Sequence, residues 1–130
     1  MEFIFNDGGR SSYFKGTAGD CVVRAIAIVT GKDYKKVYDA AFALIGYSPR
    51  DGIKHRHTRM LMEHFGGKWH ATMQIGSGCK VHLRKEELPD GRLVCKCSGH
   101  CVAVIDGVIN DLSDPSRGGT RCVYGYWLFN

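Results

Sequence analysis

The sequence has no apolar run close to the roughly 18 residues that a membrane-spanning helix requires. Its first residues, MEFIFNDGGR, lack the basic segment and the long apolar segment of a secretory signal. The chain also lacks internal repeats, low-complexity tracts and a compositional break that would separate two domains. These absences predict a cytoplasmic protein that has no membrane partner.

The composition is that of an ordinary globular domain. The 130 residues are 44% hydrophobic and 24% charged, and a chain of this length buries roughly two-thirds of its unfolded surface. We therefore expect a single domain over residues 1–130, in which residues 1–16, rich in glycine, serine and aromatic side chains, form an N-terminal leader or loop. The net charge of +5 permits an acidic partner without indicating one.

Helices are expected in the first half of the chain, over residues 17–31, 31–46 and 50–67. The first is an almost unbroken apolar run. Its valines and isoleucines favour a strand, but Thr17 as a candidate N-cap, Asp20 three residues later and Gly31 at the end favour a buried helix. Asp33 is the candidate cap of the second helix.

After residue 67 the apolar spacing changes from a helical period to alternation. The expected strands lie within residues 68–75, 92–114 and 120–130. In the middle segment, Asp106-Gly107 is the favoured two-residue turn between two antiparallel strands. N-terminal helices packed on an antiparallel sheet of about four or five strands define an α+β fold.

The chain contains six cysteines, at positions 21, 79, 95, 97, 101 and 122. Disulfides are not expected in the cytoplasm, where cysteines are more often buried, bound to metal or catalytic. Cys95, Cys97, His100 and Cys101 offer zinc ligands within seven residues, although their spacing does not match a standard site. A small zinc-binding module is therefore one alternative, whereas the preferred interpretation assigns no metal.

Cys21 falls in the first turn of the expected buried helix, where unpaired amide groups and the helix dipole lower the pKa of a thiol. Histidine is the usual base for such a thiolate, and His100 begins a strand directly after a glycine. A tight hairpin turn would set Asp111 on the side of the sheet that His100 occupies. A one-residue slip would present Asn110 instead, and Asp114 is a further candidate for orienting the histidine.

Two stretches, GDCVVRAIAI and GHCVAVIDGVINDLSDP, resemble the papain-like cysteine peptidases, in particular small bacterial and phage forms similar to the bacteriocin-leader peptidases. The resemblance spans about residues 15–115. It implies a papain-like fold in which Cys21 is the nucleophile, His100 the base and Asp111 the residue that orients the base. The GDC, DG and D pattern also resembles phage and prophage proteins, which implies a phage-encoded protein.

The sequence departs from that family at the oxyanion hole. The family places a glutamine about six residues before the cysteine, where this chain has Lys15. Lys15 is thus a candidate donor to the oxyanion, and Asp20, next to Cys21, is a second candidate at the oxyanion or substrate. Backbone amides near Cys21 are the alternative donors.

The leading hypothesis is a cysteine hydrolase that cleaves an amide, isopeptide or thioester bond without a cofactor. Its substrate would be a protein or peptide, with a host protein among the candidates. The alternative is a catalytically silent papain-like scaffold that binds or inhibits a host protein, a hypothesis supported by the missing glutamine. Nucleic-acid binding is not expected, because the basic segment RDGIKHRHTR is typical of a solvated helix face and the tryptophans are isolated.

Overall fold

The computed structural model describes the whole chain, residues 1–130. The helices are α1 (Cys21–Thr30), α2 (Tyr34–Ile45) and α3 (His55–His64), with two short 3₁₀ turns at Arg10–Ser12 and Lys85–Glu87. The strands are β1 (Glu2–Phe5), β2 (Lys68–Ala71), β3 (Val81–His82), β4 (Arg92–Cys97), β5 (His100–Ile105), β6 (Val108–Asp111), β7 (Cys122–Val123) and β8 (Gly125–Phe129). The predicted α+β class is confirmed. No helix combines the length and the apolar character that crossing a membrane requires.

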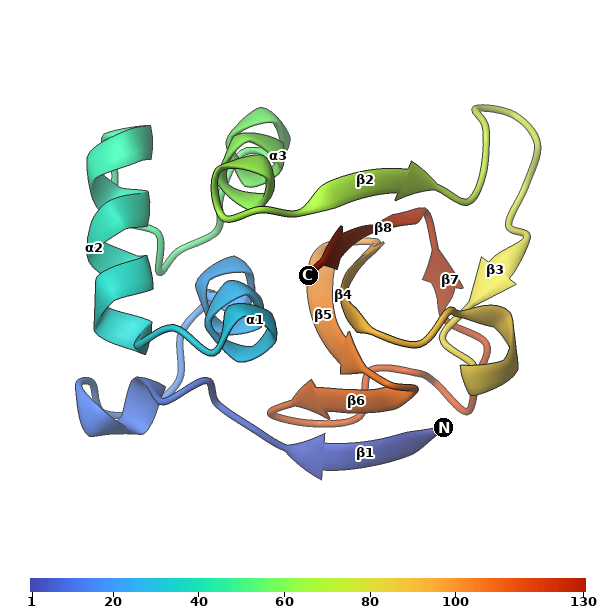
Figure 1. Cartoon of the computed structure of the whole chain (residues 1–130), viewed down its shortest axis with the longest axis horizontal. Coiled ribbons are helices and arrows are strands. Elements are labelled where there is room, and N and C mark those ends of the chain that lie inside the picture. Colours follow the sequence, from blue (N-terminus) through green and yellow to red (C-terminus); the bar gives the residue numbers. More distant parts are fainter.

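Six strands form the main sheet in the order β1-β6-β5-β4-β8-β2, and β3 and β7 form a separate pair (Figure 1). Every neighbouring pair in the main sheet is antiparallel except β1 and β6, which run parallel. The sheet is therefore mixed, and the expectation of a purely antiparallel sheet was wrong at one edge. Residues 1–16 contain this edge strand rather than only a leader or loop. Its pairing with Val108–Asp111 joins segments about a hundred residues apart, which a local pattern does not reveal.

Helix α1 lies between α2 and the sheet (Figure 1). Seven of its ten residues are buried, and its apolar side chains pack against Tyr34 and Val37 of α2 and against Val94 and Ala103 of the sheet. Each aliphatic side chain buried in this way stabilises the fold by roughly 1.5–3 kcal/mol. This burial outweighs the weak strand preference of valine and isoleucine, and the expectation of a buried helix is confirmed.

The start of α1 differs from the expected one. The helix begins at Cys21 rather than after Thr17, and Asp20 occupies the N-cap position without a side-chain cap hydrogen bond. The Asp20 carboxylate is instead bonded to Arg10 and Arg24. Cys21 thereby becomes the first residue of the helix, with nothing from the Asp20 side chain bound to the amides of its first turn.

Other local signals act as expected. Gly31 ends α1 at a φ of 70°, a left-handed conformation that glycine adopts without strain. The Asp33 side chain accepts a hydrogen bond from the Lys36 amide at 3.3 Å and caps α2. The end of α1 and the start of α2 are each set by a single residue, which is why the sequence predicts them well.

Residues 92–114, expected as two strands, contain three. The predicted turn at Asp106-Gly107 is present, with φ values of 48° and 77°, and Ala103 pairs with Asn110 in the predicted register. A second turn at Ser98-Gly99 separates β4 from β5 and pairs Cys97 with His100. His100 is therefore the first residue of the central strand β5 and directly follows the Ser98-Gly99 turn.

Cys79 and Cys122 form a disulfide. Strands β3 and β7 pair through Val81 with Val123 and His82 with Cys122, and this brings the two cysteine Cα atoms to 5.9 Å, within the range that a disulfide spans. The expectation that no cysteine pairs was wrong for this pair, because two residues 43 positions apart become neighbours only through the strand pairing.

Candidate active site

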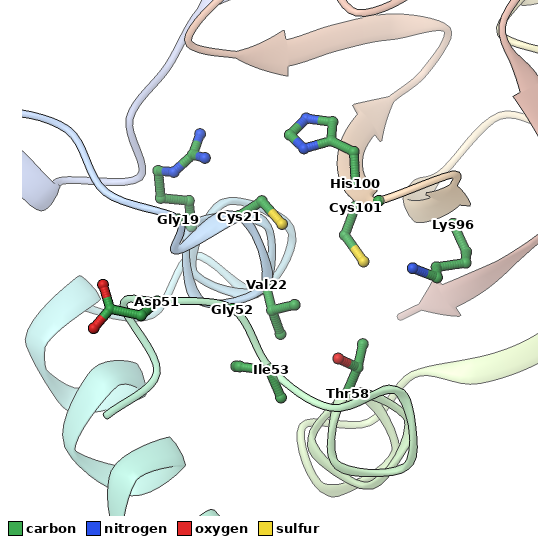
Figure 2. A pocket seen from close by; sticks show the side chains of 12 residues that line it. Gly19, Cys21, Val22, Asp51, Gly52, Ile53, Thr58, Lys96, His100 and Cys101 are labelled. Carbon is green, nitrogen blue, oxygen red and sulfur yellow. The ribbon is translucent and has the colours of Figure 1, made fainter. Parts of the chain in front are cut away.

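Cys21 lines a pocket of about 480 Å³ between the start of α1, the segment that precedes α3 and the β4–β5 turn (Figure 2). Its thiol is free and half-buried. The first backbone hydrogen bond of α1 runs from the Arg24 amide to the Asp20 carbonyl, at 3.0 Å. The amide groups of Cys21 and Val22 precede it, at the positive end of the helix dipole. The sulfur therefore lies beside donors that favour a negative charge.

His100, the first residue of β5, lines the same pocket and is held by Asp111, the last residue of β6. The His100 Nε2 atom donates a hydrogen bond to Asp111 Oδ2 at 2.7 Å. A carboxylate only accepts, so the proton of this bond belongs to Nε2. The remaining ring nitrogen, Nδ1, is left for the Cys21 thiol, which lines the same pocket and raises the pKa of His100.

A buried chain of charges holds Asp111 from the other side. Arg24 donates to Asp111 Oδ1 at 3.0 Å and to Asp20 Oδ1 at 2.8 Å. The second oxygen of Asp20 accepts from Arg10 at 3.1 Å and from the Tyr34 hydroxyl at 2.5 Å. Two guanidinium groups thus face two carboxylates, all of them buried. Because Arg24 occupies one oxygen of Asp111, the other oxygen is fixed toward His100.

These contacts shift the pKa values of the site. The hydrogen bonds with Asp111 and then with Cys21 raise the pKa of His100 to about 9, against the lowering effect of burial. Burial alone would raise the pKa of Asp111, but the hydrogen bonds from His100 and the Leu112 amide lower it. The hydrogen bond from Cys101 and, after the opposing effect of burial, the one from His100 lower the pKa of Cys21 to about 4. Both shifts favour a thiolate and an imidazolium over a neutral thiol and imidazole.

Cys101 is a part of the site that sequence reasoning assigned only to the zinc alternative. It lines the pocket, is buried, and its sulfur points into the same space as that of Cys21 (Figure 2). Its hydrogen bond to Cys21, followed by burial, raises the pKa of Cys101 well above the ordinary value. The two opposite shifts favour Cys21 as the thiol that carries the charge and Cys101 as the one that keeps its proton. The sequence held no clear signal for this role, because alternation along β5 predicts that Cys101 points to the face opposite His100.

The other predicted site residues lie elsewhere. Lys15 is exposed and does not line the pocket. Asp20 is fully buried in its ion pairs, so it supports Arg24 and has no access to a substrate. Asn110 accepts a hydrogen bond from Asn6 at 3.1 Å, and Asp114 accepts one from the Ser116 amide at 2.8 Å. The structure therefore brings together Cys21, His100 and Asp111 and leaves the four other candidates out.

The residues proposed for zinc do not converge. Cys95 and Cys97 point into the apolar cluster on the face of the sheet away from α1, whereas Cys101 packs with α1. No group of three or more histidine, cysteine, aspartate or glutamate side chains is arranged to hold a metal ion. Burial raises the pKa of Cys95 and of Cys97, which is the behaviour of thiols inside an apolar core.

The site thus combines a thiolate at a helix start, an imidazolium that can give and take a proton, and a carboxylate that orients it. The chain matches no protein-family model, no curated protein and no solved structure. Its chemistry follows from this geometry, which is suited to attack on a carbonyl carbon.

Proposed function

We propose that the protein is a cysteine hydrolase of papain-like type, in which Cys21 is the nucleophile, His100 the general acid and base, and Asp111 the residue that orients His100. The observation that supports this most directly is that Cys21 and His100 line one pocket and that His100 is hydrogen-bonded to Asp111. Each member comes from a different element, so the arrangement is not a by-product of one helix or strand.

In the first half of the reaction the Cys21 thiolate attacks the carbonyl carbon of an amide, isopeptide or thioester. A carbon–sulfur bond forms, and the carbonyl oxygen becomes an oxyanion that the amides of Cys21 and Val22 receive. When the oxyanion collapses, the bond to the leaving group breaks, and the His100 imidazolium gives its Nδ1 proton to that group. The product is a thioester on Cys21 and a neutral His100.

In the second half a water molecule attacks the thioester, and Nδ1 of His100 takes its proton. Collapse of this intermediate breaks the carbon–sulfur bond, releases a carboxylic acid and restores the thiolate–imidazolium pair. An amine in place of water would give acyl transfer through the same steps. Throughout, Asp111 keeps the proton on Nε2, and Arg24 keeps Asp111 in place.

The class of substrate follows from the chemistry and from the family resemblance. A protein or peptide supplies amide and isopeptide bonds, and the resemblance to phage proteins favours a host protein as the target. No cofactor takes part in the proposed steps.

The test is the rate of Cys21 alkylation by iodoacetamide between pH 4 and 10, measured at each cysteine by mass spectrometry. Because the Cys21 pKa is lowered to about 4, labelling is expected to reach its plateau by pH 6, far below the ~8.5 of a free thiol. His100→Ala removes a group that stabilises the Cys21 thiolate, so the pKa of Cys21 is expected to rise above 7. At pH 6 the thiolate fraction, and with it the alkylation rate of Cys21, should then fall by about tenfold or more. Labelling that titrates like an ordinary thiol in the wild type would contradict the proposal.

Acyl transfer is tested separately with p-nitrophenyl acetate. One equivalent of nitrophenol should be released in a burst, with an acetyl group on Cys21 that is then lost to water. Cys21→Ala is the matched control and should give no burst.

A silent scaffold that binds a host protein is the second candidate function. The observation that favours it is that no asparagine or glutamine side chain lines the pocket and that Lys15 lies outside it. Rapid alkylation of Cys21 with no acetylation by the ester would favour this alternative over the hydrolase.

A further inference from the structure

The pocket beside Cys21 contains one cation that has no carboxylate partner in the protein. Four of its lining side chains are ionisable besides the cysteines: Arg24, Asp51, Lys96 and His100. Arg24 is bonded to two carboxylates and His100 to one of these. Lys96 has no ion-pair partner, and neither has Asp51.

Lys96 faces Cys101, whose sulfur shares the pocket with that of Cys21. It lies on β4 directly opposite Cys101 of β5, and paired residues of an antiparallel sheet point to the same face. The ammonium group of the half-buried Lys96 is directed toward the Cys101 side of the pocket, whereas the exposed carboxylate of Asp51 points away from Cys21 (Figure 2). The Asp51 carboxylate therefore does not pair with the Lys96 ammonium.

Two further cations, Arg117 and Arg121, lie near the β4–β5 turn, outside the lining of the pocket. Arg121 donates to the Ser98 carbonyl in the β4–β5 turn at 2.7 Å. Burial raises the pKa of Cys97, the residue before this turn, and the charges of Arg121, Lys96 and Arg117 oppose that rise. Positive charge thus surrounds the β4–β5 turn, and Lys96 is the cation of this group that lines the pocket.

We infer that the substrate carries a carboxylate next to the bond to be cleaved, and that Lys96 binds it while the carbonyl carbon lies at Cys21. This inference rests on the proposed function and names its substrate class: acyl groups with an acidic side chain or a free carboxylate beside the reacting carbonyl. A half-buried ammonium without a partner has lost part of its hydration, and a carboxylate restores a charge-assisted hydrogen bond. A neutral substrate leaves Lys96 unpaired, and a basic one is repelled.

The experiment compares two alkylating reagents that differ in charge, iodoacetate and iodoacetamide. The ratio of their second-order rate constants at Cys21 is measured at pH 7 and low ionic strength, with each cysteine followed by mass spectrometry. This ratio cancels changes in thiol reactivity that a substitution itself causes. In Lys96→Met the ratio of iodoacetate to iodoacetamide is expected to fall by about 3- to 10-fold, the effect of one unit charge within several Å of the reagent. Lys96→Arg should keep the ratio close to that of the wild type.

Lys36→Met is the matched control, because Lys36 is exposed on α2 and does not line this pocket. It removes the same charge from the protein and should leave the ratio unchanged. Raising the salt to 1 M should lower the wild-type ratio toward that of Lys96→Met, since screening shortens the reach of the charge to about 3 Å. Far-UV circular dichroism verifies that each variant is folded.

Different results would overturn the proposed function and the carboxylate inference. If iodoacetamide alkylates Cys21 in the wild type no faster than an ordinary thiol, the proposed function is overturned and the inference with it. If Cys21 reacts rapidly but the ratio in Lys96→Met equals that in Lys36→Met, the inference about the carboxylate is overturned and the proposed function stands.

Discussion

His100 and Asp111 are joined by a 2.7 Å hydrogen bond between Nε2 and Oδ2. The two residues begin and end neighbouring strands, β5 and β6, and the hairpin between them sets their distance. Since this bond is the largest contribution to the raised pKa of His100, it controls the charge of the group that activates Cys21.

Replacing Asp111 by asparagine should lower the pKa of His100 from about 9 toward the ordinary ~6.5. Asparagine keeps the shape of the side chain but removes the charge that stabilises the imidazolium. The measurement is the pH titration of the His100 ring signals by NMR. Asp114→Asn, which changes a neighbouring carboxylate bonded only to the Ser116 amide, should leave the titration unchanged. A His100 pKa that remains near 9 in Asp111→Asn would refute this account of the pair.

Arg24 should be worth far more to stability than an exposed cation. Arg24→Met leaves Asp20 and Asp111 facing each other without a shared counter-ion, and breaking such a buried pair costs about 3–5 kcal/mol. Lys35→Met removes the partner of Asp39 from an exposed pair on α2 and should cost about 0.5 kcal/mol or less. Urea unfolding of both variants gives the comparison, and equal losses would show that the buried chain is not a stabilising unit.

Arg24→Lys adds a test of geometry. A lysine ammonium is a single point charge and does not reproduce the fork that reaches Asp20 and Asp111 at once. We expect a stability between that of the wild type and that of Arg24→Met, together with a His100 pKa below that of the wild type. Full retention of both would mean that charge alone is sufficient at this position.

Cys101 should tune the acidity of Cys21. Its hydrogen bond is the largest cause of the lowered pKa of Cys21, so Cys101→Ala should move the alkylation midpoint of Cys21 upward, whereas Cys101→Ser, which keeps a donor, should restore a low value. Cys97→Ala removes a buried thiol on the opposite face and is expected to leave the midpoint unchanged. Identical midpoints in the wild type and Cys101→Ala would exclude this role.

The Cys79–Cys122 disulfide should stabilise the fold without affecting the site. It joins two residues 43 positions apart. Loop-closure entropy predicts that reducing it lowers the free energy of unfolding by roughly 4 kcal/mol. Urea unfolding with and without dithiothreitol measures the loss. The double variant Cys79→Ala/Cys122→Ala should be insensitive to the reductant and should retain the wild-type alkylation profile of Cys21. An altered profile would mean that the β3–β7 pair helps to position the site.

The sequence by itself determines the features that depend on local backbone preferences and on periodicity. Asp33 and Gly31 mark helix ends through one cap and one left-handed residue. Asp106-Gly107 sets the hairpin register, from which the partnership of Asp111 with the His100 side follows. These signals act over a few residues, so a single chain contains all the information that they need.

Only the tertiary structure decides which distant groups meet. Arg24 contacts Asp111 across 87 residues, and β1 joins the sheet edge at β6. Cys101 and Lys96 line the pocket of Cys21 because β4 pairs with β5 and α1 packs on the sheet. The position of Lys15 matched the expected oxyanion donor in sequence spacing, yet its side chain is exposed away from the pocket. Spacing along a chain fixes neither the direction of a loop side chain nor the partners of a buried charge, because both depend on how the packed elements close around them.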